Sequence, residues 1–354
     1  MRRSTRAVNA GGVTIGGGSS VKIQSMLNVP LTDTDRAIRQ IEALEKEGCE
    51  IIRAAVPNMD AAEAIKTIMP HMNVPLVADI HFDHRLAIAS VENGVSKVRI
   101  NPGNIGGKDR VREVCACLKD HGVPVRIGVN SGSVEKDILE KYGHVCAQAL
   151  VESAERSIAY FNEFGYDDIV MSIKASDVVM TVEANRLFSE KYDYPLHLGV
   201  TEAGAALSGV IRSSVGIGTL LMEGIGDTIR VSLTGDPVQE VTAAKEILTA
   251  AGLREEGVRI VSCPTCARCK TDTLSIVEYL KANTGHIKEH VVAAVMGCVV
   301  NGPGESKEAD VGAACGDGKA AIFKGGKTYM TVPSEDIGRV LLSEIEKIAA
   351  ERRK

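Results

Sequence analysis

Short apolar segments recur through the first two thirds of the chain, and longer amphipathic segments separate them. Near-continuous apolar strands are typical of a parallel sheet that is covered on both faces. Eight strand–helix units within about 250 residues favour a closed (β/α)8 TIM-type barrel over an open doubly wound sheet. The predicted strands are VKIQSM (21–26), EIIRAAV (50–56), PLVADI (75–80), KVRINP (97–102), PVRIGV (124–129), DIVMSIK (168–174), PLHLGV (195–200) and TIRVSL (228–233).

The amphipathic segments carry helix signals. The last of them, 237–251, has Asp236 as N-cap, Pro237 at the first helical position and Gly252 after its end. An early glycine-rich stretch, 11–20, lacks the Lys-Ser/Thr pair of a phosphate-binding loop. We interpret that stretch as a series of turns.

The hydrophobic pattern changes after Gly252. Two further apolar strands follow, with a helix near 271–284 between them, then a hairpin around Gly325 and Gly326 and a helix near 334–350. This order predicts a small α+β domain behind the barrel. We therefore expect two domains, 1–252 and 253–354.

Composition narrows the functional classes. The 354 residues carry a net charge of -5, which predicts no general affinity for nucleic acid or anionic membranes. The chain has no Trp and only five Phe, so a base-stacking surface is not expected. The N-terminus shows no apolar signal-peptide core, and no apolar run is long enough to cross a bilayer. We expect a cytoplasmic protein, in which nine cysteines serve as thiols or metal ligands.

Three cysteines and one glutamate form a candidate metal site. Cys263 and Cys266 make a C-x-x-C pair after one apolar strand, and Cys298 ends another. Thiolates that meet in this way select zinc or iron–sulfur centres. The turn residues NGPG after Cys298 can bring Glu305 back towards the metal.

The pattern leaves the kind of centre open. A structural zinc site needs four firm ligands, and Cys269 or Cys315 can provide the fourth. An iron–sulfur cluster held by three cysteines leaves one iron for an oxygen ligand such as Glu305 or water. Cys269 is a rival ligand, because Cys263, Cys266 and Cys269 also read C-x2-C-x2-C. A redox-active dithiol is a third alternative.

Polar and basic residues gather where the predicted barrel strands end, which is where TIM-barrel active sites lie. Arginine forks bind phosphate oxygens, so several on one rim favour a substrate with more than one phosphate. The alternative is a set of internal salt bridges with Asp79, Glu202 and Asp227. Glu202 is a candidate general acid or base, and His81 a proton donor or phosphate contact. The mouth residues are Arg53, Asp79, His81, Arg99, Asn101, Arg126, Asn130, Lys174, Glu202 and Arg212.

Several motifs together resemble one enzyme family. CPTC, MGCVVNGPGE, VRINPGN, RIGVN, HLGVTEAG and EGIGDTIRVSL are similar to those of the 4-hydroxy-3-methylbut-2-enyl diphosphate synthase family, also called IspG or GcpE. The resemblance runs from about Ile23 to the C-terminal helix. It implies an iron–sulfur oxidoreductase of the non-mevalonate isoprenoid pathway, which reductively opens and dehydroxylates 2-C-methyl-D-erythritol 2,4-cyclodiphosphate.

The resemblance also implies a cofactor, partners and residue roles. One 4Fe–4S cluster per chain would be held by Cys263, Cys266 and Cys298, with Glu305 on the fourth iron. Reduced ferredoxin or flavodoxin would supply electrons, and the protein would be a head-to-tail homodimer. The diphosphate would be bound by Arg53, Arg99, Asn101, Arg126, Asn130 and Arg259. A zinc-stabilised TIM barrel that binds phosphometabolites is the alternative function.

Overall fold

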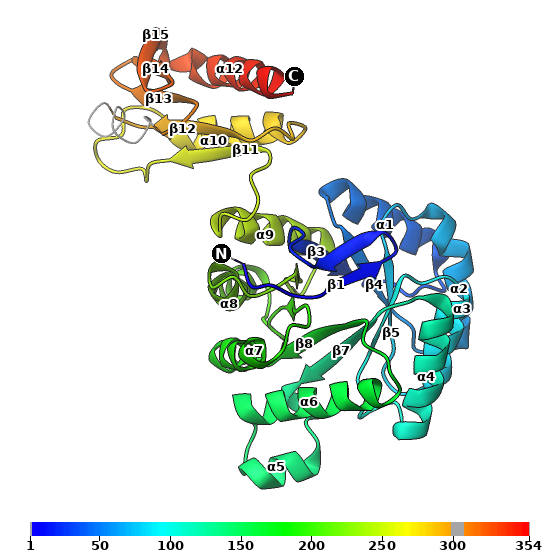
Figure 1. The fold of residues 1–354 in the computed structure, drawn as a ribbon. Helices are drawn as coiled ribbons and strands as arrows, with labels where there is room; N and C mark the ends of the chain where they lie inside the picture. The colour runs from blue at the N-terminus through cyan, green and yellow to red at the C-terminus, as the bar shows by residue number, and fades with distance from the viewer. Residues whose placement is uncertain (1, 299–307, 354) are drawn as a thin grey trace. The chain divides into compact units, whose positions relative to one another are not determined.

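The computed structural model describes residues 2–298 and 308–353 (Figure 1). Glu305 therefore lies outside the described residues. The chain divides into two compact units, Met1–Leu253 and Arg254–Lys354, and each is treated by itself below. In the described parts, no helix has the length and apolar character needed to cross a membrane.

The first unit is a closed parallel barrel, as predicted. Its sheet has the strand order β8-β7-β6-β5-β4-β3-β10-β9, and a parallel bridge between Met171 and Leu196 joins the two outer strands. The strands are β3 (Lys22–Met26), β4 (Ile51–Ala55), β5 (Leu76–Asp79), β6 (Lys97–Ile100), β7 (Val125–Asn130), β8 (Ile169–Lys174), β9 (His197–Leu198) and β10 (Thr228–Ile229).

Helices surround this barrel and contribute apolar side chains to its core. The predicted last helix begins as expected, because the Asp236 carboxylate accepts a hydrogen bond from the Val238 backbone and Pro237 occupies the first turn. The helices are α1 (Thr34–Glu47), α2 (Met59–Ile68), α3 (His84–Glu92), α4 (Lys108–His121), α5 (Lys136–Tyr142), α6 (Ala147–Glu163), α7 (Val178–Lys191), α8 (Ala206–Met222) and α9 (Pro237–Ala250).

An N-terminal hairpin covers the amino-terminal end of the barrel. Strands β1 (Ala7–Ala10) and β2 (Val13–Gly16) pair antiparallel, so the interpretation of 11–20 as turns alone was wrong for β2. The turn itself is at Gly11 and Gly12, whose φ angles of 56° and 88° suit glycine. The hairpin's buried side chains form one cluster with barrel residues, namely Val8, Ala10 and Ile15 with Ile51, Val77 and Val170.

Removing the largest side chain of this hairpin cluster tests its contribution to stability. Ile15 is fully buried, so Ile15→Ala leaves a cavity and should lower the free energy of unfolding by about 2–5 kcal/mol. Guanidinium unfolding followed by circular dichroism measures this. Thr14→Ala, at the exposed neighbouring position, is the control. Equal stability of the two variants would show that the hairpin does not close the barrel core.

In its described residues, the second unit has a five-stranded sheet and two α-helices. Strands β11 (Val258–Ser262), β12 (Val291–Met296) and β13 (Val311–Cys315) are parallel, whereas β14 (Lys319–Lys324) and β15 (Lys327–Pro333) form the predicted hairpin. Helices α10 (Thr273–Thr284) and α12 (Ile337–Arg352) pack on this sheet through Leu280, Leu341 and Ile345. Because β11, β12 and β13 run parallel, the cysteines near their carboxyl ends share one edge of the sheet.

Candidate functional site

Five neighbouring strands place charged side chains inside the barrel near its carboxyl end. Arg53 lies on β4, Asp79 ends β5, Arg99 lies on β6, Arg126 on β7, and Lys174 ends β8. Asp79 is in register with Arg99, and Arg99 with Arg126. Asp79, Arg99 and Arg126 are only 3%, 6% and 1% exposed. The structure thus brings together the predicted residues of this set.

Asp79 is the anion at the centre of these cations. Its Oδ1 lies 3.2 Å from Arg99 Nη1, and its Oδ2 lies 3.9 Å from Arg53 Nε and 3.2 Å from His81 Nε2. Burial raises the pKa of Asp79, but Arg53, His81 and Arg99 outweigh it and hold that pKa well below its usual range. Asp79 is therefore a carboxylate, and the expected internal salt bridge exists at this residue.

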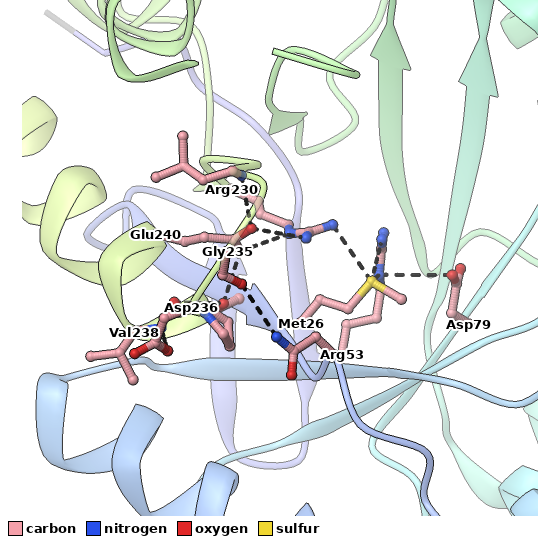
Figure 2. A network of polar contacts seen from close by, with 12 residues as sticks. Met26, Arg53, Asp79, Arg230, Gly235, Asp236, Val238 and Glu240 are labelled. Carbon is pink, nitrogen blue, oxygen red and sulfur yellow. Dashed lines mark hydrogen bonds and ion pairs between the residues drawn. The ribbon is translucent and has the colours of Figure 1, made fainter. Parts of the chain in front are cut away.

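A second carboxylate holds Arg230, the cation that directly follows β10 (Figure 2). Glu240 of α9 accepts hydrogen bonds from Arg230 Nε and Nη2, both at 3.2 Å. The thioether of Met26 lies between Arg230 and Arg53, and accepts from Arg53 Nη2 at 2.7 Å. A thioether is a weak acceptor, so the guanidinium of Arg53 is poorly satisfied within the protein. Burial lowers the pKa of Arg53 to about 10, with Arg230 and Arg99 adding to the effect.

The site has more positive than negative charge. Six buried or half-buried cations face two described carboxylates, Asp79 and Glu240. Nε and Nη1 of Arg126 and Nζ of Lys97 have no hydrogen-bond partner in the described structure. Burial, together with neighbouring cations, lowers the pKa of Lys97, Arg126 and Lys174. An anionic ligand would stabilise this arrangement. The six cations are Arg53, Lys97, Arg99, Arg126, Lys174 and Arg230.

Two glycines leave the space that the side chains of Arg99 and Lys174 occupy. A Cβ added at Gly128 would lie 2.5 Å from Arg99 Nε, and one added at Gly199 would lie 2.5 Å from Lys174 Nζ. Gly128 lies on β7, next to the strand of Arg99, and Gly199 directly follows β9. Their lack of a side chain therefore sets where Arg99 and Lys174 can point.

Filling one of these spaces should displace a cation. In Gly128→Ala the new methyl group pushes the Arg99 guanidinium aside, and kcat/KM for the substrate should fall about 100-fold, because small misplacements at a reacting site are costly. Steady-state kinetics measures this. Gly285→Ala, where a Cβ meets no atom within 4 Å, is the control. Unchanged kinetics in Gly128→Ala would show that the Arg99 position is not important.

Two asparagines occupy the loops that follow β6 and β7. Asn101 Nδ2 donates to Ser133 Oγ at 3.0 Å, and Asn101 Oδ1 accepts from the Gly103 backbone at 3.1 Å. The backbone of Asn130 donates to the same hydroxyl at 3.3 Å. Ser133 therefore ties the two loops together, and places both predicted asparagines at the barrel mouth.

Three other predicted residues lie outside this buried group. Glu202 follows β9, is exposed, and has a φ angle of 55°; in the described residues it is the one non-glycine with positive φ. Such a backbone conformation is strained and often marks a functional position. Arg212 is exposed on α8, and Arg259 is exposed on β11 in the second unit.

The cysteines of the second unit gather around Gly297. Cys263 Sγ accepts a hydrogen bond from the Gly297 backbone at 3.1 Å, and a Cβ at Gly297 would lie 2.3 Å from Cys269 Sγ. Burial raises the pKa of Cys315 to about 11, and Cys269, Cys263 and Cys298 add to the shift. Several thiols therefore share this edge of the sheet. That donor set suits a soft metal centre.

The predicted ligands are not arranged as a complete metal site. In 2–298 and 308–353, no three His, Cys, Asp or Glu side chains converge closely enough to bind a metal. Cys298 is buried, Cys263 is half-buried and Cys266 is exposed. Arg268 lowers the pKa of the Cys266 thiol through its backbone and side chain, which favours the thiolate that binds metal.

Some residues of the barrel interior were not predicted. Gln24, Lys97 and His197 are almost fully buried, and each has a polar side-chain atom with no partner in the described structure. The sequence carried a partial signal for Lys97, because Lys97 and Arg99 alternate along one strand and so face the same side. His197 Nδ1 lies 2.7 Å from Thr228 Oγ1, and burial beside Arg126 lowers its pKa, so it is neutral.

Comparison with known proteins agrees with this architecture. Solved dihydropteroate synthases have a similar fold: that of Yersinia pestis aligns with a TM-score of 0.50 at 14% identity, covering 70% of this chain and 100% of its own. At that identity, the likeness concerns the fold alone.

Relatives with higher sequence identity align with this chain over nearly its whole length. The 4-hydroxy-3-methylbut-2-en-1-yl diphosphate synthase (flavodoxin) of Caldanaerobacter subterraneus subsp. tengcongensis is 54% identical over 99% of both chains. The enzyme of that name from Thermodesulfovibrio yellowstonii is 52% identical, covering 98% of this chain and 99% of its own. Residues 5–245 match the GcpE TIM-barrel domain, and residues 259–347 match the GcpE protein C-terminal domain. The chain belongs to the GcpE family.

Proposed function

We propose that this protein is a 4-hydroxy-3-methylbut-2-enyl diphosphate synthase that reductively opens and dehydroxylates 2-C-methyl-D-erythritol 2,4-cyclodiphosphate. The observation that carries the proposal is the barrel interior, where six buried or half-buried cations face two described carboxylates. A diphosphate supplies the missing negative charge. The names of relatives about 50% identical over the full chain support the same reaction.

In this proposal, the diphosphate binds to cations that the barrel already holds in place. Arg53, Arg99, Arg126 and Lys174 neutralise its charge, and they strengthen their contacts as the ring opens and the leaving diphosphate gains negative charge. Asn101 and Asn130 orient the phosphates from the loops. Asp79 positions Arg99 and His81, so that His81 can contact the substrate. Arg212 and Arg259 are further proposed phosphate contacts.

A proton is needed when the substrate loses its hydroxyl group as water. We assign its delivery to Glu202, which follows β9 at the carboxyl end of the barrel. The strained backbone of Glu202 supports a functional role, because such strain is retained chiefly where it serves a site.

The proposed cofactor is one 4Fe–4S cluster per chain, held by Cys263, Cys266 and Cys298, with Glu305 as the fourth ligand. The gathering of thiols around Gly297 fits a thiolate-bound cluster. When bound, the cluster supplies electrons one at a time to the substrate. Reduced flavodoxin is the proposed electron donor, since the relatives carry that donor in their names; reduced ferredoxin is the alternative.

Elemental analysis followed by turnover tests the function. Anaerobically purified protein should contain about four iron and four sulfide per chain, with broad absorbance near 400 nm. It should then convert the cyclodiphosphate when a reduced donor is added. About one zinc per chain without sulfide would favour the zinc-stabilised binding protein instead. No turnover by protein that holds the full cluster would refute the proposed reaction.

We also propose that the protein is a cytoplasmic homodimer. Helix α8 exposes an apolar face, on which Leu207, Ile211, Val215 and Met222 are 72%, 52%, 54% and 78% exposed. Their spacing of four, four and seven residues places them on one side of the helix. Exposed apolar faces of this kind mark contacts between proteins. All described cysteines are free thiols, which fits a reducing compartment.

Charges on the α8 face should separate the subunits. Ile211→Glu/Val215→Glu should run as a monomer, because burying two unpaired carboxylates costs several kcal/mol. Analytical ultracentrifugation measures the mass. Glu190→Lys/Glu246→Lys, at exposed positions on α7 and α9, is the control. A dimer that survives the α8 substitutions would place the subunit interface elsewhere.

A further inference from the structure

A cleft of about 700 Å³ opens in the second unit beside a proposed cluster ligand. Cys298 lines the cleft, together with Cys315 and the small residues Ala314 and Ala321. Small side chains let another surface approach the sheet closely. A partner in this cleft would therefore lie near the sulfur of Cys298.

The described walls of the cleft are basic. They carry Arg268, Lys270 and Lys319, all exposed, against a single described acid, Asp317. Lys270 Nζ lies 3.4 Å from Asp317 Oδ1, and both groups are largely in solvent, so this pair is weak. The cleft thus presents a positive potential to an approaching partner.

The net charges of the two units also favour binding of an acidic partner to the second unit. Residues 254–354 contain fifteen Lys and Arg and fourteen Asp and Glu, for a net charge of +1. The remaining residues carry 26 basic and 32 acidic side chains, for a net charge of -6. An acidic partner is therefore repelled by the barrel and attracted to the second unit, and most of all to its basic cleft.

The cations of the cleft differ in exposure from those of the proposed substrate site. At the barrel mouth the cations are buried in fixed positions, which suits tight recognition of a small anion. At the cleft they are exposed, and small apolar residues lie beside them. That combination is typical of brief, salt-sensitive contacts between electron-transfer proteins.

We propose that this cleft is the docking surface for the electron donor, a small acidic flavin protein of the flavodoxin type. The proposal rests on the proposed function. Lys270 and Lys319 attract the donor's acidic surface, and the small residues between them let its flavin approach the edge that carries Cys298. Arg268 contributes charge to the same surface, but it also affects the Cys266 thiol.

Charge reversal at the cleft tests the docking surface. Lys270→Glu/Lys319→Glu spares Arg268, and Lys281→Glu/Lys288→Glu makes the same charge change at exposed positions that do not line the cleft. Turnover is measured with reduced flavodoxin and, separately, with reduced methyl viologen, a small cation that needs no basic docking surface. The iron content of each variant is measured first.

The expected result is a selective loss. At low salt, the cleft variant should lose about tenfold or more in kcat/KM for flavodoxin, and added salt should slow wild type more than the variant. Turnover with methyl viologen, and the KM of the cyclodiphosphate, should stay within twofold of wild type. The control variant should keep most of its flavodoxin-dependent rate.

Other results overturn the proposal. Equal losses with both reductants would show that the lysines serve the cluster or the substrate. No loss with flavodoxin, or an equal loss in the control variant, would place docking elsewhere. Wild-type protein with a full cluster that is inactive with methyl viologen and with flavodoxin would refute the proposed function itself, and the docking proposal with it.

Discussion

Cys298→Ser protein, purified without oxygen, should retain less than a tenth of the wild-type iron and sulfide and show no measurable turnover. Cys298 is buried where β12 ends, one residue after Gly297, whose backbone donates to Cys263 Sγ. A serine hydroxyl is a poor ligand for iron at neutral pH, whereas the thiolate is the ligand that clusters prefer. Iron and sulfide assays with a visible spectrum measure the loss.

Cys117→Ser is the matched control for this substitution. Cys117 is a half-buried thiol on α4 of the barrel, and it should keep full iron content and activity. Circular dichroism of the Cys298→Ser protein should show a folded chain, since a hydroxyl in place of the thiol changes little volume. Normal iron, sulfide and turnover in Cys298→Ser would remove Cys298 from the ligand set.

Arg126→Met should abolish catalysis while leaving the protein as stable as wild type, or more stable. Arg126 is 1% exposed, and its Nε and Nη1 have no partner in the described structure. Replacing an uncompensated buried charge by an apolar side chain of similar length removes a desolvation cost. Losing the proposed buried contact to the diphosphate should lower kcat/KM by about 100- to 1000-fold or more.

Two measurements together test this trade between stability and activity. Thermal unfolding gives the stability, and steady-state kinetics gives the loss of transition-state binding. Arg186→Met, which removes an exposed pair with Glu223, should change both only slightly. A strongly destabilised Arg126→Met that still turned over at the normal rate would mean that Arg126 supports the fold rather than the substrate.

The barrel could be predicted from the sequence because its strands carry a strong local signal. All eight predicted segments contain strands, and the end signals of α9 at Asp236 and Pro237 act as expected. The N-terminal hairpin could not be predicted in this way. Its two strands pair with each other across a glycine turn. Their alternation of buried and exposed residues is short, and it can be recognised only when the barrel end that they cover is known.

The candidate site was predictable in part. Arginines near strand ends point to a phosphate site whatever the register of the strands. Lys97 and His197 lie deeper, and their burial depends on that register, which strand patterns do not fix in advance. Cys269 and Cys315 were expected as possible fourth ligands, but the closeness of their thiols to this edge follows from the parallel course of β11, β12 and β13.

The N-terminal hairpin also closes one end of the barrel. Val8, Ala10 and Ile15 cover the amino-terminal end with apolar side chains, and the interior of such a barrel is packed, so a ligand of the buried cations has to approach from the carboxyl end. Under the proposed function, substrate and product would both pass through this end and would bind to the same cations in turn. Product should therefore compete with substrate, and the departure of one molecule should set the earliest moment at which the next can arrive.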